Sequence, residues 1–189
     1  MTSPAGIGHN RGPDLNGEAG WRRFAWTKAR ESLMPTLPVE VVRLHVRRAA
    51  ALGLPYRTYA GVRAQTGRDV IGFLFSTNAL RMLRAGDAAD PAVAARLAAI
   101  AADRTALARP PLVPATVRAA LPLDAAHPAP RFTDSWAVMR DSLRAVIRAR
   151  GLPPDGIVLV GETGEERDWA EAGKLAAFLT GESYFGARA

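Results

Sequence analysis

The sequence predicts an α/β protein with a small, Rossmann-like, mostly parallel sheet and more helix than strand overall. Two short apolar runs, residues 70–75 and 157–160, have the length and composition of buried strands. Polar loop residues and an amphipathic pattern follow each run, as expected where a parallel strand leads into a helix. Because ligands of such sheets bind at the carboxyl ends of the strands, a functional site is expected at these two places.

Composition limits the class of protein further. The chain has 189 residues, which fits one ordinary domain. It contains no cysteine, which excludes a disulfide framework and a thiolate metal site. Its apolar stretches are far shorter than the ~20 residues of a membrane helix, and its first residues lack the pattern of a secretory signal. We therefore expect a cytoplasmic protein without a membrane span.

The first twenty residues differ in composition from the rest. They carry five glycines and almost no apolar side chains, so they cannot bury enough surface to offset the entropy lost on ordering. We expect a disordered tail at 1–20 and a single α/β domain at 21–189.

Three helices are expected before the first strand. Apolar residues recur every four positions over 21–34, and Pro35 ends that pattern. The second helix, 38–52, begins near Pro38 and ends before Gly53. One face of it is apolar and is expected to point inward. The third helix covers 56–65. The inward residues of the second helix are Val39, Val42, Val46 and Ala49.

Beyond the first strand the pattern predicts mainly helices. One begins at 79–84 after a capping hydroxyl, and a second covers 91–107 behind an Asp-Pro start. Frequent prolines over 109–130 indicate an irregular surface connection with one helical turn at 116–121. A helix capped by Thr133 or Asp134 precedes the second strand, and a last helix covers 167–179.

Charge is unevenly distributed along the chain. Residues 21–68 contain ten basic and two acidic side chains, a net charge of +8, whereas residues 155–182 carry a net charge of −5. A basic surface attracts an acidic partner, either nucleic acid or protein. The alternative explanation of this basic charge is the codon usage of a GC-rich genome, because 23 of the 25 basic residues are arginine. The candidate partner-binding residues are Arg22, Arg23, Arg43, Arg47 and Arg48.

Two segments resemble haloacid-dehalogenase-like phosphatases. The strand at 70–75 followed by Ser76, Thr77 and Asn78 resembles that family's second motif, whose hydroxyl holds the phosphoryl group. The strand at 157–160 followed by Glu162 resembles the fourth motif, whose acids hold magnesium. The resemblance implies a Rossmann-like fold and a phosphate- or nucleotide-handling site made by these four residues, with Mg²⁺ as its cofactor.

The sequence departs from that family at the motif that carries the catalytic nucleophile. The family needs an Asp-x-Asp nucleophile, and no Asp-x-Asp occurs in this chain. The acids Glu165, Glu166 and Asp168 have two interpretations: they hold a metal together with Glu162, or they stabilise the start of the last helix, as carboxylates do. We therefore expect a non-catalytic binding or adaptor protein without a cofactor, and keep the degenerate phosphate-handling enzyme as an alternative.

Two further alternatives remain open. Residues 56–84 fit a DNA-binding helix-turn-helix if Asp69 begins a recognition helix, although Gly72 and the apolar run favour a strand. The aromatic residues Trp21, Trp26 and Tyr56 fit the contact surface of a homo-oligomer.

A short segment of the tail has its own resemblance. Gly-Ile-Gly-His-Asn-Arg-Gly-Pro, residues 6–13, resembles an N-terminal signature of small alphaproteobacterial and phage-related proteins. Ile7 and His9 would anchor a docking peptide there, and the alternative is an unstructured leader.

Overall fold

The computed structural model describes residues 37–186. The compact unit that carries the fold starts at Arg43, and the preceding unit contributes only residues 37–42 to the described part. The expected tail and the expected helix at 21–34, with Trp21, Trp26, Arg22 and Arg23, lie outside the described residues. The elements are α2 Val39–Ala51, α3 Tyr56–Thr66, β1 Gly72–Ser76, α4 Pro91–Ala98, β2 Asp103–Ala108, α5 Pro114–Ala120, β3 Ala125–Pro128, α6 Trp136–Ala149, the 3-10 turn Pro154–Gly156, β4 Ile157–Gly161, α7 Gly164–Gly173, β5 Ala177–Thr180 and α8 Gly181–Phe185.

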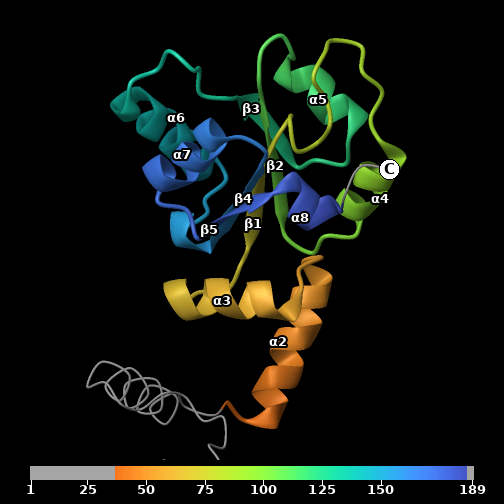
Figure 1. Cartoon of the computed structure of the whole chain (residues 1–189), viewed down its shortest axis with the longest axis vertical. Helices are drawn as coiled ribbons and strands as arrows, with labels where there is room; N and C mark the ends of the chain where they lie inside the picture. Colours follow the sequence, from red (N-terminus) through yellow and green to blue (C-terminus); the bar gives the residue numbers. More distant parts are fainter. Residues whose placement is uncertain (1–36, 187–189) are drawn as a thin grey trace, which may run out of the picture. The chain divides into compact units, whose positions relative to one another are not determined.

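The five strands form one parallel sheet in the order β3-β2-β1-β4-β5. The chain moves outward from β1 through β2 to β3, then crosses back and places β4 on the other side of β1 (Figure 1). This reversal between β1 and β4 is the topological switch point of the sheet. The predicted α/β class with a parallel sheet is confirmed.

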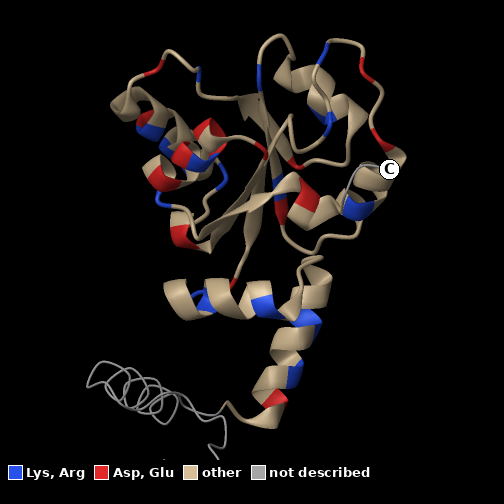
Figure 2. Cartoon of the chain, viewed as in Figure 1, with Lys and Arg blue, Asp and Glu red and all other residues tan. Residues whose placement is uncertain are grey.

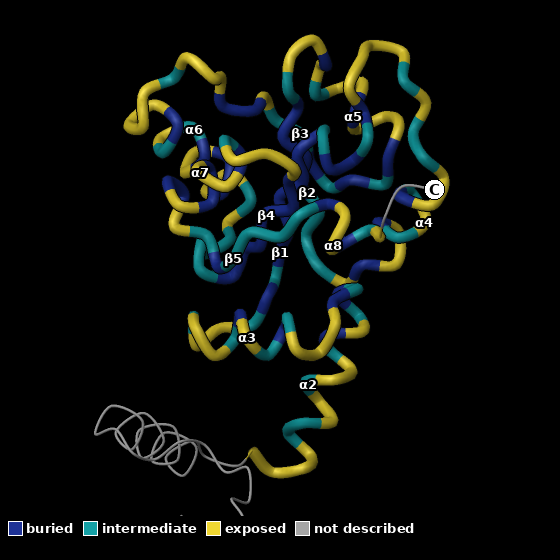
Figure 3. Tube along the Cα trace, in the orientation of Figure 1, coloured by how far each residue is buried: buried dark blue, intermediate teal, exposed yellow. Residues whose placement is uncertain are grey.

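Both faces of the sheet are covered by helices, which is why its central strands are apolar throughout. Successive side chains of β1 point to opposite faces. Phe73 and Phe75 belong to the core cluster that includes residues of α4, α5 and α8, whereas Leu74 belongs to the cluster with α6 and α7. Figure 1 shows α6 and α7 together on one side of the sheet. Figure 3 shows the strands as the most buried part of this unit.

Local sequence signals place several helix starts. Ser135 caps α6, because its hydroxyl accepts the N–H of Val138; the cap therefore lies after both expected positions, Thr133 and Asp134. The capping box of α7 pairs Thr163 with Glu166, so this helix begins at Gly164, before the expected start at 167. The expected elements at 38–52, 56–65, 70–75 and 157–160 are confirmed as α2, α3, β1 and β4.

The helix expected at 79–84 is wrong. A single turn follows β1, in which the Leu80 N–H donates to the Ser76 carbonyl. Arg81 then adopts a φ of 61°, a left-handed conformation that a right-handed helix cannot continue.

Two further expectations need correction in the middle of the chain. The helix expected at 91–107 ends with α4 at Ala98, and residues 103–108 form strand β2. In the connection over 109–130, the expected helical turn at 116–121 is confirmed as part of α5, but residues 125–128 form strand β3. Alanine favours helices in isolation, but pairing with β1 on one side and β3 on the other overrides that preference.

The last helix is shorter than expected. Residues 167–179 divide into the second half of α7 and strand β5, with Lys174 ending the helix at a φ of 54°. The helix-turn-helix alternative is also wrong, because the residues of its recognition helix form β1, the central strand of the sheet.

Candidate functional site

The two predicted ligand-binding segments lie at the same edge of the sheet. Because β1 and β4 are parallel neighbours in register, Ser76 at the end of β1 and Glu162 after β4 emerge at their carboxyl ends. This edge at the switch point is where α/β sheets bind ligands.

Ser76 and Thr77 are not available to a ligand, because both are completely buried and both hydroxyls hold the backbone. The Ser76 Oγ accepts the N–H of Ala79 at 3.1 Å, and the Thr77 Oγ1 accepts the N–H of Arg109 at 3.1 Å. These hydroxyls therefore fix the loops that follow β1 and β2.

Glu166 is the buried centre of this edge. Its Oε2 accepts the N–H groups of Glu162 at 2.6 Å and Thr163 at 3.0 Å, and its Oε1 accepts the Asn78 side-chain amide at 2.9 Å. The side chain is completely buried and so closes the space between β1 and α7. Glu166 thus serves as a helix cap and a bridge between two loops.

Arg109, at the end of β2, is neutralised by carboxylates. Its Nη2 lies 2.8 Å from Glu165 Oε2 and its Nη1 lies 3.6 Å from Glu166 Oε1. The guanidinium lies 5.4 Å from the ring centre of Trp169, within range of a cation–π interaction. An incoming anion would have to displace these carboxylates to reach Arg109.

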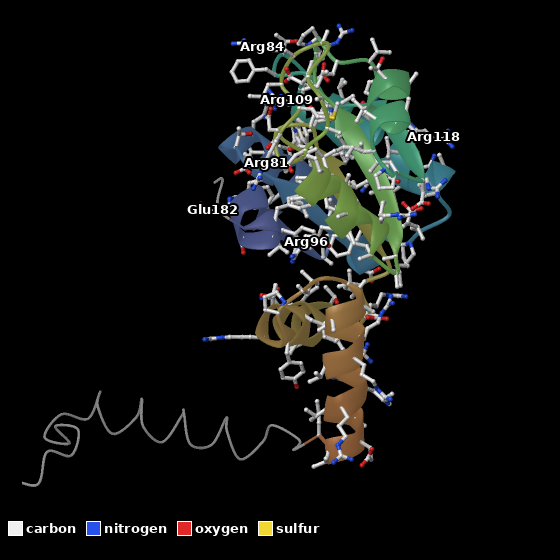
Figure 4. All side chains as sticks on the ribbon, turned by 90° about the vertical axis from the view of Figure 1, so that its right-hand side faces the viewer. Arg81, Arg84, Arg96, Arg109, Arg118 and Glu182 are labelled. Carbon is white, nitrogen blue, oxygen red and sulfur yellow. The ribbon has the colours of Figure 1, made fainter. Side chains whose placement is uncertain are left out.

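A pocket of about 590 Å³ opens beside this network. The predicted residues Asn78 and Glu162 both line it, and the rest of the lining comes from the turn after β1, the cap of α7, and α8. Figure 4 shows Arg81 and Glu182 close together in this region. The lining residues are Asn78, Arg81, Leu83, Glu162, Thr163, Glu182 and Gly186.

Arg81 is held by two acceptors. Its Nη1 donates to Asp90 at 2.8 Å and its Nη2 donates to the Gly186 carbonyl at 2.9 Å. The N–H of Ala92 and the Arg81 guanidinium both lower the pKa of the Asp90 carboxyl, so this acid stays ionised.

Sequence reasoning missed Arg81, Arg109 and Glu182 as site residues. Arg81 lies in a turn that was expected to be a helix, and the strand before Arg109 was not expected. Glu182 lies on α8, beyond the unexpected strand β5. Without these elements no pattern in the sequence brings the three residues together.

The predicted basic residues divide into two groups. Arg48 is structural: it bonds Asp69 at 2.9 Å and the carbonyls of Val70 and Ala101. Arg43 and Arg47 are exposed on α2, where Figure 2 shows basic residues along the helix. The expected inward face of α2 is wrong for Val39 and Val46, which are 63 % and 46 % exposed, and right for Ala49.

Fold and site together define an α/β protein of Rossmann-like strand order with a polar pocket at its switch point. No protein-family model, no curated protein and no solved structure matches the chain. Within residues 37–186, no group of three or more histidine or acidic side chains is arranged to hold a metal ion. None of the helices over the same residues has the length and apolar character to span a membrane.

Proposed function

We propose that this chain is a non-catalytic binding protein that uses the outer face of α2 to bind an acidic helical segment of another protein. The supporting observation is an exposed surface, called here the α2 face, formed by Arg43, Leu44, Val46 and Arg47. The helix is anchored on its other side by Arg48 and Ala49.

Helical spacing places these four residues on one face. Arg43 and Arg47 are one turn apart, Val46 follows Arg43 by three positions, and Leu44 precedes Arg47 by three. Leu44 is 54 % exposed and Val46 is 46 % exposed, so each arginine has an aliphatic neighbour that is open to solvent. A face of this kind complements a helix with acidic and apolar residues at the same spacing.

The aliphatic residues favour a protein partner over nucleic acid. Binding to a phosphate backbone depends on basic groups and counterion release, and Leu44 and Val46 add nothing to it. On a protein surface the same side chains contribute about 25 cal/mol for each Å² of apolar area that they bury. Electrostatic attraction then sets the orientation and the association rate.

The chemistry at the sheet edge supports a non-catalytic role. Ser76, Thr77 and Glu166 are buried in contacts that hold loops, and the charge of Arg109 is offset by two carboxylates. A nucleophile needs an accessible, activated group beside a base, and these side chains are committed to structure.

The test is a binding titration with a synthetic acidic amphipathic helix that carries Glu and Leu at i, i+3 and i+4 positions. Fluorescence anisotropy with the full chain should show saturable binding that weakens as salt is added. The double variant Arg43→Glu/Arg47→Glu should lose at least about tenfold in affinity, or 1.4 kcal/mol.

The matched control is Arg118→Glu/Arg144→Glu, which makes the same change in net charge at exposed arginines on α5 and α6. It should retain the affinity of the parent chain. Equal losses in the two double variants would reduce the effect to net charge and contradict the proposal. Preference for a duplex oligonucleotide over the peptide would reject a protein partner.

A further inference from the structure

We propose that the carboxyl edge of the sheet docks on the surface of an anionic phospholipid membrane. The supporting observation is a set of exposed apolar side chains in and next to the loops that follow β1, β2 and β3, called here the sheet rim. Their exposed fractions are 50 % for Leu83, 57 % for Val113, 83 % for Phe132 and 51 % for Trp136. The sheet rim shares no residue with the α2 face, and its docking does not depend on the protein partner.

The topology of the sheet brings these four residues to one edge. β1, β2 and β3 are parallel neighbours, so the segments that follow them all leave the sheet at its carboxyl edge. Leu83 follows β1, Val113 follows β2, and the two aromatic residues follow β3. Figure 3 shows long exposed stretches in these segments, and Figure 4 shows Arg84, the neighbour of Leu83, at this end of the unit.

Two of these apolar side chains stand next to an arginine in the sequence. Leu83 precedes Arg84, and Phe132 follows Arg131. Both arginines are exposed, and neither guanidinium forms a hydrogen bond or an ion pair with another residue of 37–186. Each guanidinium can therefore bind a lipid phosphate while the adjacent apolar side chain enters the acyl layer.

The same kind of turn orders both pairs. In residues 84–87 and 131–134 the aspartate N–H donates to the arginine carbonyl, at 3.1 and 3.0 Å. The Asp87 Oδ2 accepts the N–H groups of Leu83 and Arg84, both at 2.8 Å. The Asp134 Oδ2 accepts the N–H of Arg131 at 2.8 Å. Both carboxylates therefore hold the backbone, and the charge of Asp87 attracts Arg84 without forming an ion pair. Turns that are ordered before docking lose less entropy on binding.

The aliphatic members of the sheet rim favour a lipid surface over a nucleic acid. A single strand would use the arginines for its phosphates and the aromatic rings for base stacking, and Leu83 and Val113 would add nothing. A membrane uses all of these groups, because aliphatic side chains enter the acyl layer and tryptophan lies at the level of the headgroups. A fluid headgroup layer also adapts to side chains that come from three separate loops.

The preference for anionic lipid rests on two arginines. The other basic residues at this edge, Arg81 and Arg109, are offset by carboxylates, as described above. Arg84 and Arg131 are therefore the cations that meet the negative surface potential of a membrane.

Sedimentation of the full chain with phospholipid vesicles tests this docking. The chain should bind phosphatidylcholine vesicles weakly and should bind more tightly as phosphatidylglycerol is added. Phe132→Ala/Trp136→Ala should weaken binding at least about tenfold, because it removes the largest apolar area of the sheet rim. Trp136→Phe should retain binding but lose the blue shift of tryptophan emission that vesicles cause in the parent chain.

A matched pair of variants separates the sheet rim from other apolar surfaces. Leu83→Ala/Val113→Ala should weaken vesicle binding about fivefold. Leu44→Ala/Val46→Ala removes the same side-chain atoms from positions of similar exposure on the α2 face and should bind vesicles like the parent chain. Equal losses in the two variants, or unimpaired binding by Leu83→Ala/Val113→Ala, would overturn the proposal.

A second pair tests the role of charge. Arg84→Gln/Arg131→Gln should abolish the preference for phosphatidylglycerol, whereas Arg118→Gln/Arg144→Gln makes the same change in net charge at exposed positions and should keep it. Equal losses here would reduce the effect to net charge and contradict the proposal. Absence of vesicle binding by a folded chain, or binding of a single-stranded oligonucleotide in its place, would overturn it as well. Circular dichroism confirms the fold of each variant.

Discussion

The role of Glu166 in the structure differs from the roles that its position in the sequence suggested. Its position after β4 suggested either a metal ligand or a residue that stabilises the helix start. The structure buries it completely and gives it three hydrogen bonds, two from backbone N–H groups and one from Asn78. Capping was predictable from the spacing of Thr163 and Glu166, but the bond to Asn78 was not, because 88 positions separate the two residues.

Glu166→Gln should destabilise the fold. The substitution keeps the shape but replaces an anionic acceptor by an amide, so at least one buried donor loses a charged partner. We expect a loss of about 2 kcal/mol in the free energy of unfolding, measured by urea denaturation. Asp168→Asn, two positions along α7 and exposed, should change it by less than about 0.5 kcal/mol. Equal effects would contradict a central role for Glu166.

Arg48 and Arg47 are adjacent residues with opposite roles. Arg48→Ala removes three hydrogen bonds that tie α2 to the residues preceding β1 and β2. It should cost about 2 kcal/mol of unfolding free energy, because the Asp69 carboxylate and two carbonyls lose a donor. Arg47→Ala should leave stability unchanged and should weaken binding of the acidic peptide. Thermal unfolding of both variants measures the difference, and the reverse pattern would reject these assignments.

Among the elements, a strand could be predicted from the sequence only where its composition differed clearly from that of a helix or a loop. β1 and β4 are continuous apolar runs and were found. β2 begins with Asp103-Arg104-Thr105 and continues with alanine and leucine, a composition that also fits a helix. β3 and β5 have four residues each, and β5 is only partly buried. Their strand conformation is imposed by pairing with neighbours distant in sequence, which local patterns do not contain.

The ion pair between Arg104 and Asp124 links β2 to the loop before β3. The guanidinium donates to both carboxylate oxygens, at 3.0 and 2.9 Å, and lowers the pKa of Asp124. A folded-state pKa below the unfolded value of about 3.9 means that the pair stabilises the fold above that pH. This stabilisation is lost as the pH falls through the folded-state pKa.

Asp124→Asn tests this linkage. At pH 7 the variant should be less stable than the parent chain by about 1 kcal/mol, because the partly exposed pair is screened by solvent. The difference should shrink as the pH is lowered below about 4, where the parent chain also loses the charge. Urea denaturation at pH 7 and pH 3 measures it, and a pH-independent difference would reject the assigned cause.

At the scale of the whole molecule, the sequence indicated the correct fold class, because two buried strands followed by amphipathic segments are typical of a parallel α/β sheet. It also indicated that Asn78 and Glu162 belong to one region. It did not reveal the full lining of the pocket, because Arg81 and Glu182 come from a turn and a helix that were not expected. The basic character of α2 was apparent, but not that Arg48 is committed to the fold.

Binding of an acidic helix to the α2 face is tested by an NMR titration of the isotopically labelled full chain with the acidic amphipathic peptide. We expect chemical-shift changes that centre on Arg43, Leu44, Val46 and Arg47, grow smoothly with peptide concentration, and vanish in Arg43→Glu/Arg47→Glu. Shift changes confined to the pocket around Glu162 and Glu182, with α2 unaffected, would contradict it.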